Sequence, residues 1–171
     1  RLEYRGYDSC GVACLDEGGW LLKKQQGRIA RLQEELSGRK AEVRFTNGIA
    51  HTRWATHGRP NKVNAHPHTD CSGNLFVVHN GIIENFEELK TQLRDSGHVF
   101  VSETDTEVIA HLIEEYNAGD LKGAVRQAVS RLEGSFAICV ISKNEPGTLV
   151  GARKDSPLVA GVAKDGIYLA S

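Results

Sequence analysis

The chain has 171 residues, of which 40% are hydrophobic and 25% charged, and its formal net charge is -1. This composition is typical of a globular protein with one good core, and the balanced charge gives no electrostatic footprint for nucleic acid. No apolar run approaches the roughly 18 residues of a membrane helix, so we expect neither a membrane nor a nucleic acid as partner. The four cysteines are too few and too irregularly spaced for a disulfide framework. We therefore expect reduced thiols and a cytoplasmic protein.

The two ends of the sequence favour a piece of a longer polypeptide. The chain opens with Arg1 in place of Met, and its last residues, 167–171, are typical of a strand that is still running. We expect a single domain, residues 1–171, that is truncated at both ends.

The first half of the chain predicts mainly strands. Apolar runs of strand length flank a turn signal at 16–19, and one stretch shows apolar residues at helical spacing. The predicted elements are a hairpin of residues 10–15 and 20–24, a short helix at 28–36, and strands at 48–53 and 75–79. A polar loop, 55–73, joins the last two strands, and loops of that length are often functional.

The second half predicts helices followed by strands. A helix is expected at 85–96, and Thr104 and Glu107 have the spacing of a capping box that begins a second helix. A third, at 120–133, carries an apolar stripe, so two adjacent helices should cover one face of a sheet. Strands of an antiparallel sheet are then predicted at 136–141, 148–152, 158–162 and 167–169, with a break at Pro146-Gly147. The fold class is therefore α+β, with sheets layered against helices.

The segment 53–58 has the pattern of a ligand-binding loop. It follows a short apolar strand and carries polar groups that a core would not tolerate unpaired. The planar guanidinium of Arg53 offers a bidentate partner for a carboxylate. The alternative is structural: Trp54 only caps the edge of the core, while Arg53 forms an ordinary ion pair.

Two further segments place polar groups at strand ends or turns. Asn80 and Gly81 predict a sharp turn after the strand 75–79, where a side-chain amide and a backbone N–H could form an oxyanion hole. A plain turn is the alternative, because Asn-Gly is a common turn dipeptide. Asp105 could hold an ammonium group if helix capping does not use its side chain. Together with Arg53, these groups suit a free amino acid.

Histidines and cysteines allow two competing interpretations. His66, His68, Asp70 and Cys71 resemble a metal-ligand cluster, although the second ligand pair of an established zinc motif is missing. A cysteine nucleophile is also conceivable, but the three other cysteines lie in apolar strand patterns that are typical of inert thiols. Only Cys71 is expected to be exposed, in a polar loop without a base-orienting partner.

Five motifs, taken in order, carry a resemblance to a known family. They are RLEYRGYDS (1–9), GIAHTRWATHG (48–58), NAHPH (64–68), HNGIIEN (79–85) and SETDTE (102–107). As an ordered set they resemble the glutaminase domain of the glucosamine-6-phosphate synthases, the glutamine-dependent fructose-6-phosphate aminotransferases. The resemblance spans essentially the whole chain. It implies a class II glutamine amidotransferase with the N-terminal nucleophile hydrolase fold, a four-layer αββα sandwich that here lacks its first strand.

The resemblance also implies roles for residues of this sequence. Arg53, with help from Thr56 and His57, would bind the α-carboxylate of glutamine, and Asp105 would bind its α-amino group. Trp54 would line the glutamine site and move with the substrate.

Asn80 and Gly81 would form the oxyanion hole, as the chemistry of their donors also suggests. We expect no cofactor and no metal. The expected partners are glutamine and the sugar isomerase domain of the same parent polypeptide, a homo-oligomer that uses fructose 6-phosphate as acceptor.

One feature of the family has no counterpart here. Its nucleophile is an N-terminal cysteine whose own α-amino group acts as the base. The family pattern places that cysteine roughly two dozen residues or fewer upstream of Tyr4. Arg5 resembles a residue that lies beside the nucleophile in the folded family members. We therefore expect the chain as it stands to lack the nucleophile and to be inactive alone.

Two other hypotheses fit the same residues. The chain could be a non-catalytic module that binds an amino acid or serves as a scaffold, since the nucleophile is not among its residues. It could also be a zinc-dependent hydrolase that uses His66, His68 and Cys71.

Overall fold

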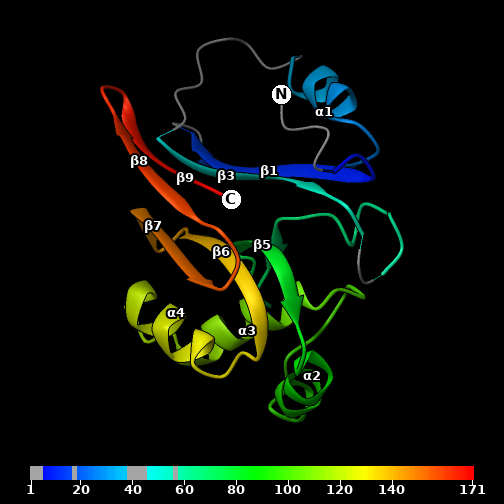
Figure 1. Cartoon of the computed structure of the whole chain (residues 1–171), viewed down its shortest axis with the longest axis vertical. Coiled ribbons are helices and arrows are strands. Elements are labelled where there is room, and N and C mark those ends of the chain that lie inside the picture. Colours follow the sequence, from blue (N-terminus) through cyan, green and yellow to red (C-terminus); the bar gives the residue numbers. More distant parts are fainter. Residues whose placement is uncertain (1–5, 17–18, 38–45, 56–57) are drawn as a thin grey trace.

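The computed structural model describes residues 6–16, 19–37, 46–55 and 58–171 of the chain. Their helices and strands form four layers, in which one helix, two antiparallel sheets and a group of three helices are stacked in that order (Figure 1). The four-layer αββα sandwich predicted from the sequence is therefore confirmed. Because the two sheets face each other, polar side chains at adjoining strand ends can converge on one place.

The first sheet has the strand order β2-β1-β3, and its strands pair antiparallel. The strands are β1 (Ser9–Asp16), β2 (Gly19–Gln26) and β3 (Asn47–Arg53), which confirms the predicted hairpin and the strand at 48–53. Helix α1 (Ile29–Ser37) lies on the outer side of this sheet and buries Leu32 (Figure 1). This is the packing of a short amphipathic helix with one apolar stripe.

The second sheet lies between the first sheet and the helices. Its strands, in spatial order, are β4 (His68–Thr69), β5 (Leu75–Ile83), β6 (Gly134–Ser142) and β7 (Glu145–Lys154).

Side chains alternate along β5. Leu75 and Val77 pack on the helix side, whereas Phe76 and Val78 pack with residues of the first sheet. Burial of such a side chain contributes about 1.5–3 kcal/mol. A strand buried on both faces reads as a nearly continuous apolar run, which is why 75–79 is conspicuous in the sequence.

Strand β7 differs from its prediction in where it begins. It contains Pro146 and Gly147, at which the sequence predicts a break. The reason is the position of β7 at the edge of the sheet, where a missing backbone N–H costs no ladder hydrogen bond.

Helices α3 (Thr106–Tyr116) and α4 (Leu121–Val129) cover the outer face of the second sheet, and α2 (Phe86–Asp95) packs against α3. The predicted placement of two adjacent helices on one sheet face is confirmed, because α3 contacts both β5 and α4. Helix α4 ends at Val129 and not at 133, since the following residues turn toward β6. Among the described residues, no helix is both long and apolar enough to cross a membrane.

The start of α3 also departs from the predicted capping box. Glu107 does not reach back to the N–H of Thr104; it accepts hydrogen bonds from the backbone N–H groups of Val101 and Ser102, at 2.8 and 2.7 Å. Thr104 N–H donates to the hydroxyl of Ser102 instead. The side chain of Asp105, at the N-cap position, makes no capping hydrogen bond. Asp105 is therefore available for another purpose.

The last two strands form a hairpin of their own. Strands β8 (Val159–Ala163) and β9 (Gly166–Ala170) pair antiparallel with each other. The sequence predicts that they share a sheet with β6 and β7, but they do not join those strands. The chain leaves the edge of the second sheet at a turn in which Asp155 has a φ of 62°. The hairpin then rises beside the two sheets (Figure 1).

Candidate active site

A cavity of about 120 Å³ opens where the end of β3, the middle of β5 and the start of α3 meet. Its lining includes five of the residues that the sequence singles out: Arg53, Trp54, Asn80, Gly81 and Asp105. Three segments far apart in the chain are thus brought to one place. The roles expected for these residues stay predictions, and Thr56, His57 and Arg5 lie outside the described residues.

Arg53 is the last residue of β3 and is only 4% exposed. Its guanidinium donates to the carbonyls of Gly58 and Arg59, at 3.3 and 3.5 Å, and lies 3.9 Å from a carboxylate oxygen of Asp8. Burial lowers the pKa of Arg53, while the nearby carboxylates of Asp8 and Asp105 raise it. The ion pair of the structural alternative is present, yet it is long and leaves the guanidinium at the cavity wall.

Trp54 is 62% exposed, with its ring 5.5 Å from that of Tyr7. A ring this exposed buries little apolar surface, which disfavours the alternative in which Trp54 only caps the core edge, but its role at the site stays a prediction. Because this large aromatic ring lines the cavity and is exposed to solvent, the Trp54 side chain can close over a bound ligand.

Asn80 points its amide oxygen at His51. The distance between His51 Nε2 and Asn80 Oδ1 is 2.7 Å. Because an amide oxygen only accepts, Nε2 must carry the proton, and the Asn80 side chain is held in one orientation. Within the described part of the chain, the Asn80 amide nitrogen has no partner, so it is free to donate to a ligand.

Asn80 and Gly81 do not form the predicted turn. Both belong to β5, which continues to Ile83, and they pair with Ala137 and Phe136 of β6. Gly81 has a φ of 124°, and a Cβ added to it would lie 2.0 Å from the carbonyl oxygen of Ser135. Non-local pairing with β6 therefore overrides the local turn preference, and only glycine fits at this point of the strand.

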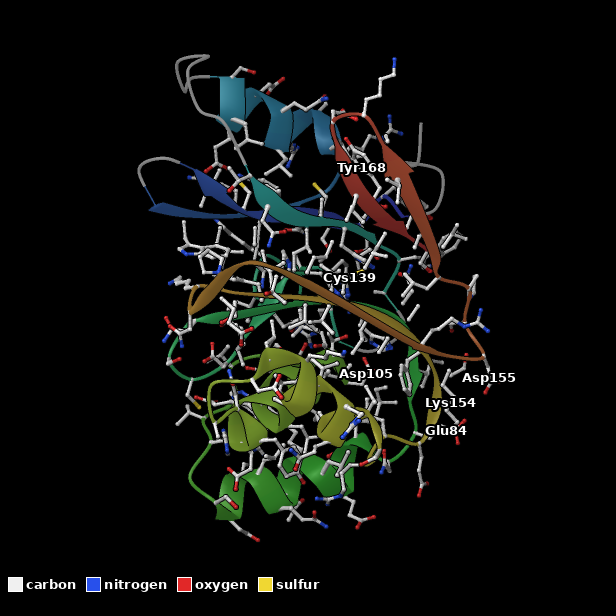
Figure 2. All side chains as sticks on the ribbon, turned by 90° about the vertical axis from the view of Figure 1, so that its left-hand side faces the viewer. Glu84, Asp105, Cys139, Lys154, Asp155 and Tyr168 are labelled. Atoms are coloured by element: carbon white, nitrogen blue, oxygen red, sulfur yellow. The ribbon has the colours of Figure 1, made fainter. Side chains whose placement is uncertain are left out.

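Asp105 is 4% exposed and accepts a hydrogen bond from the backbone N–H of Ile83 at 2.9 Å. This bond fixes the carboxylate at the junction of α3 with β5. Figure 2 shows Asp105 on the helix side of the second sheet, whereas Cys139 lies on the side that faces the first sheet. The second oxygen of Asp105 remains for a cation such as an ammonium group.

Four histidines lie at the cavity: His51, which is half-buried, and His66, His68 and His79, which are buried. All but His68 belong to the cavity lining. The rings of His51 and His66 stack at 4.2 Å, and His66 Nδ1 accepts from the backbone N–H of His79 at 3.3 Å. Burial lowers the pKa of His51 and His66, lowers that of His79 to about 4 and lowers that of His68 to about 3. All four imidazoles are therefore neutral at pH 7, which places neutral donors and acceptors around the cavity.

Two ring nitrogens of this group stand out. His51 Nδ1 and His79 Nε2 are buried and have no hydrogen-bond partner among the described residues. Buried polar atoms rarely lack a hydrogen-bond partner, and a polar ligand in the adjoining cavity would supply partners for both nitrogens.

His51, His79 and Thr106 line the cavity although the sequence analysis assigns them no role. For His51 a signal exists, since strand alternation puts it on the same face as Arg53. For Thr106, which lies 2.9 Å from His79 Nδ1, the contact depends on the packing of α3 against β5 and no local pattern predicts it.

The metal cluster considered for His66, His68 and Cys71 is not formed. His66 and His68 contact Thr106 and Thr104, at 3.5 and 3.1 Å, in the histidine group at the cavity. Cys71 is exposed, as predicted, but lies among other side chains. The zinc hydrolase interpretation of these three residues is therefore wrong.

The cysteines do not enter the cavity. Cys10 and Cys14 are buried in β1, and no cysteine belongs to the cavity lining. Burial raises the pKa of both Cys71 and Cys139 thiols, which is opposite to what a nucleophile requires. The expectation that Cys71 lacks a base-orienting partner is wrong. His98 and His111 lie 3.6 and 3.5 Å from its sulfur, and Glu114 lies 3.0 and 3.2 Å from their Nδ1 atoms.

Comparison with known proteins gives the class to which this fold and site belong. The profile of the glutamine amidotransferase domain matches residues 51–171, and the chain belongs to that family. A glutamine phosphoribosylpyrophosphate amidotransferase from B. subtilis, solved with ADP and GMP, superposes with a TM-score of 0.80 at 28% identity, over 98% of this chain and 36% of that chain. An allosteric regulatory enzyme of purine biosynthesis superposes with the same TM-score at 29% identity and the same coverage. The fold is that of the N-terminal nucleophile hydrolase amidotransferases.

Within this class, the similar curated proteins are glutamine–fructose-6-phosphate aminotransferases (isomerizing). The Thermotoga maritima protein is 57% identical over 171 residues, which are 100% of this chain and 28% of that protein. Those of Methanothermobacter thermautotrophicus and Pyrococcus horikoshii are each 54% identical, over 100% of this chain and 29% of their own length. The chain thus spans less than a third of these relatives.

Proposed function

We propose that the cavity binds glutamine and that the chain is the glutamine-hydrolysing domain of a longer enzyme. That enzyme would transfer the amide nitrogen to fructose 6-phosphate on a sugar isomerase domain, giving glucosamine 6-phosphate and glutamate. One observation carries the proposal: the guanidinium of Arg53 and the carboxylate of Asp105 line the same small cavity as the donors of Asn80 and Gly81. An amino acid needs this set of partners, because it carries a carboxylate, an ammonium group and a carbonyl to be attacked.

In the proposed reaction, a thiol attacks the side-chain carbonyl carbon of glutamine. The carbonyl electron pair moves to oxygen, where Asn80 Nδ2 and the N–H of Gly81 would stabilise the charge. The proton of the thiol passes to the base. When the intermediate collapses, the C–N bond breaks, the leaving nitrogen takes up this proton and departs as ammonia, and a γ-glutamyl thioester remains. Water then hydrolyses the thioester to glutamate and regenerates the thiol. Arg53 and Asp105 would hold the substrate so that the attack is effectively unimolecular.

We infer that the attacking thiol belongs to an N-terminal cysteine of the natural protein, with its α-amino group as base. The position of the cysteines in this chain supports the inference, because none of the four lines the cavity. The same observation favours a second candidate, a module that binds an amino acid without turning it over. A cytoplasmic location stays a prediction.

The test uses the full gene product with its natural N-terminus. We expect glutamine hydrolysis, labelling of the N-terminal cysteine by a thiol-directed glutamine analogue, and glucosamine 6-phosphate formation when fructose 6-phosphate is added. A folded gene product that binds glutamine by calorimetry without hydrolysing it would favour the binding module. A folded product with neither activity would rule out both.

A further inference from the structure

A second cluster of polar side chains lies apart from the glutamine cavity. It consists of Cys71, His98, His111 and Glu114, none of which lines that cavity. Cys71 precedes β5, His98 follows α2, and His111 and Glu114 lie one turn apart on α3. Three segments that are distant in sequence therefore converge on one place.

The distances in this cluster are those of metal ligands. Cys71 Sγ lies 3.6 Å from His98 Nδ1 and 3.5 Å from His111 Nδ1. Glu114 Oε2 lies 3.0 Å from His98 Nδ1 and 3.2 Å from His111 Nδ1, and all four atoms lie within 4.8 Å of one another. A tetrahedral zinc ion with bonds of about 2.0–2.3 Å separates its ligand atoms by about 3.3–3.7 Å. The cluster is thus close to the size that one zinc ion requires.

The outer nitrogen of each imidazole lies on the side of a carboxylate. His98 Nε2 is within hydrogen-bond distance of Glu115 Oε2, at 2.9 Å, whereas His111 Nε2 lies 3.6 Å from Glu107 Oε1 and has no hydrogen-bond partner among the described residues. Histidines that bind metals commonly donate their other N–H to a carboxylate, which fixes the tautomer and orients the ring. The contact with Glu115 places a proton on His98 Nε2, so that His98 Nδ1 can present a lone pair to the centre of the cluster. A metal ion at the centre requires the same tautomer of His111.

Hydrogen bonds are the alternative to a metal at this centre. The Nδ1–H groups of both imidazoles can donate to Glu114 Oε2, which also accepts from the backbone N–H of Cys71 at 3.1 Å. A single cation would replace the two protons and contact all four ligand atoms at once.

We propose that Cys71, His98, His111 and Glu114 bind one zinc ion in a closed, structural site. One sulfur, two nitrogens and one oxygen form a borderline-soft donor set suited to zinc, and the thiolate and carboxylate together balance its charge. The backbone N–H of Val99 lies 3.4 Å from the sulfur and would stabilise the thiolate. Cys71 is exposed, so the ion can enter from solvent. The proposal replaces the expectation that the protein holds no metal, and it is independent of glutamine hydrolysis.

The site would hold the loop before β5 and the segment after α2 against α3. Since Asp105 and Thr106 at the start of α3 line the glutamine cavity, the ion would anchor the helix that supports the cavity floor. The expected consequence is stability, because an ion that binds only the folded state raises the temperature of unfolding.

The test measures metal in the purified full gene product without a histidine tag, under reducing conditions. We expect one zinc ion per chain after preparation with zinc, and a thiolate-to-cobalt charge-transfer band after exchange for Co²⁺. Cys71→Ala should abolish both signals, whereas Cys139→Ala, which removes a thiol outside the cluster, should change neither. Glu115→Gln should weaken zinc binding about 10- to 100-fold while leaving the ligands in place.

Zinc should also raise the unfolding temperature of the natural protein and of Cys139→Ala but not that of Cys71→Ala. Absence of stoichiometric zinc together with absence of the cobalt band in the natural protein would overturn the proposal, even if Cys71→Ala failed to fold. Zinc retained by folded Cys71→Ala, or lost from folded Cys139→Ala, would overturn it as well.

Discussion

His51 Nε2 donates a hydrogen bond of 2.7 Å to the amide oxygen of Asn80, and this bond turns the amide nitrogen of Asn80 toward the cavity. The two residues come from facing sheets, β3 and β5, so the orientation of the amide depends on how the sheets pack together. A neutral donor fixed in this way is suited to stabilising a developing oxyanion, because it needs little reorganisation during the reaction.

Asn80→Ala in the full gene product should lower the kcat of glutamine hydrolysis about 100- to 1000-fold, the usual effect of removing one oxyanion donor. Its KM should change little, because the lost interaction matters chiefly in the transition state. His51→Ala should lower kcat less, since it only frees the amide to rotate. Steady-state kinetics at several glutamine concentrations measures both, and a rise in KM without a fall in kcat would count against the role.

Asp105→Asn should raise the KM for glutamine about 10- to 150-fold, which corresponds to a lost charged hydrogen bond of about 1.5–3 kcal/mol. The amide oxygen of the variant can still accept from the N–H of Ile83, so thermal unfolding should change little. The control is a glutamine analogue that lacks the α-amino group. The natural protein and the variant should handle this analogue alike; a persistent difference between them would place the effect elsewhere.

Arg53→Lys should also raise the KM, because an ammonium group cannot reproduce the bidentate contact with a carboxylate. We expect a loss of about 1.5–3 kcal/mol in kcat/KM. The matched control is Arg126→Lys, since Arg126 is an exposed residue of α4 outside the cavity lining. Equal effects of the two substitutions would contradict a specific role for Arg53.

Gly81→Ala should prevent folding or destabilise the protein by several kcal/mol. The added methyl group would meet the carbonyl oxygen of Ser135 at 2.0 Å, in a backbone conformation with a φ of 124°. Gly73→Ala is the control, because Gly73 also has a positive φ, 67°, but nothing lies within 4 Å of its added Cβ. That variant should lose only about 1–2 kcal/mol by denaturant unfolding. Similar losses in both variants would mean that the close approach at Gly81 does not matter.

The buried histidines predict a loss of stability in weak acid. In the folded protein the pKa of His79 is about 4 and that of His68 about 3, whereas the unfolded chain titrates near 6.5. As the pH falls below 6.5 the unfolded chain therefore binds protons that the folded chain does not, and the free energy of unfolding decreases. Each histidine contributes a slope of about 1.4 kcal/mol per pH unit down to its folded pKa.

Denaturant unfolding between pH 6.5 and pH 4.5 measures this slope. His68→Asn should reduce it by about 1.4 kcal/mol per pH unit. Carboxylates add little in this window, because Glu107 loses its stabilising effect only at lower pH: burial raises its pKa, but contacts with His111 and Ser102 bring it down to about 2. A free energy of unfolding that stays constant between pH 6.5 and pH 4.5 would show that the histidines are not buried in neutral form.

The apolar periodicity of the sequence predicts most of the helices and strands because burial determines them. The strand at 75–79, for example, is buried on both faces, and no local preference competes with that burial. Where a local preference exists, pairing elsewhere in the chain can override it. Asn80-Gly81 is an ordinary turn dipeptide, yet β6 continues the ladder through it. Glu107 has capping-box spacing, yet its carboxylate binds the backbone of the segment before α3.

Two of the predicted site residues can be proposed from the chemistry of their side chains, whereas the roles of Trp54, Thr56 and His57 come only from the family resemblance. Arg53 and Asp105 suit the two charges of an amino acid, whatever their distance in the chain. His79 and Thr106 were not accessible to sequence reasoning, since their contact arises only when α3 packs on β5. The same holds for Cys71 and His98, which belong to different loops and meet only in the folded chain.

The location of Asn80 and Gly81 inside a paired strand limits how this cavity can be redesigned. An engineer who seeks a different amide substrate could alter Trp54, which is exposed, without disturbing the core. Moving the oxyanion donors, in contrast, would require shifting β5 against β6 and would carry the buried side chains of both strands out of place. Substrate preference is therefore much easier to change than the position at which the reacting carbonyl is held.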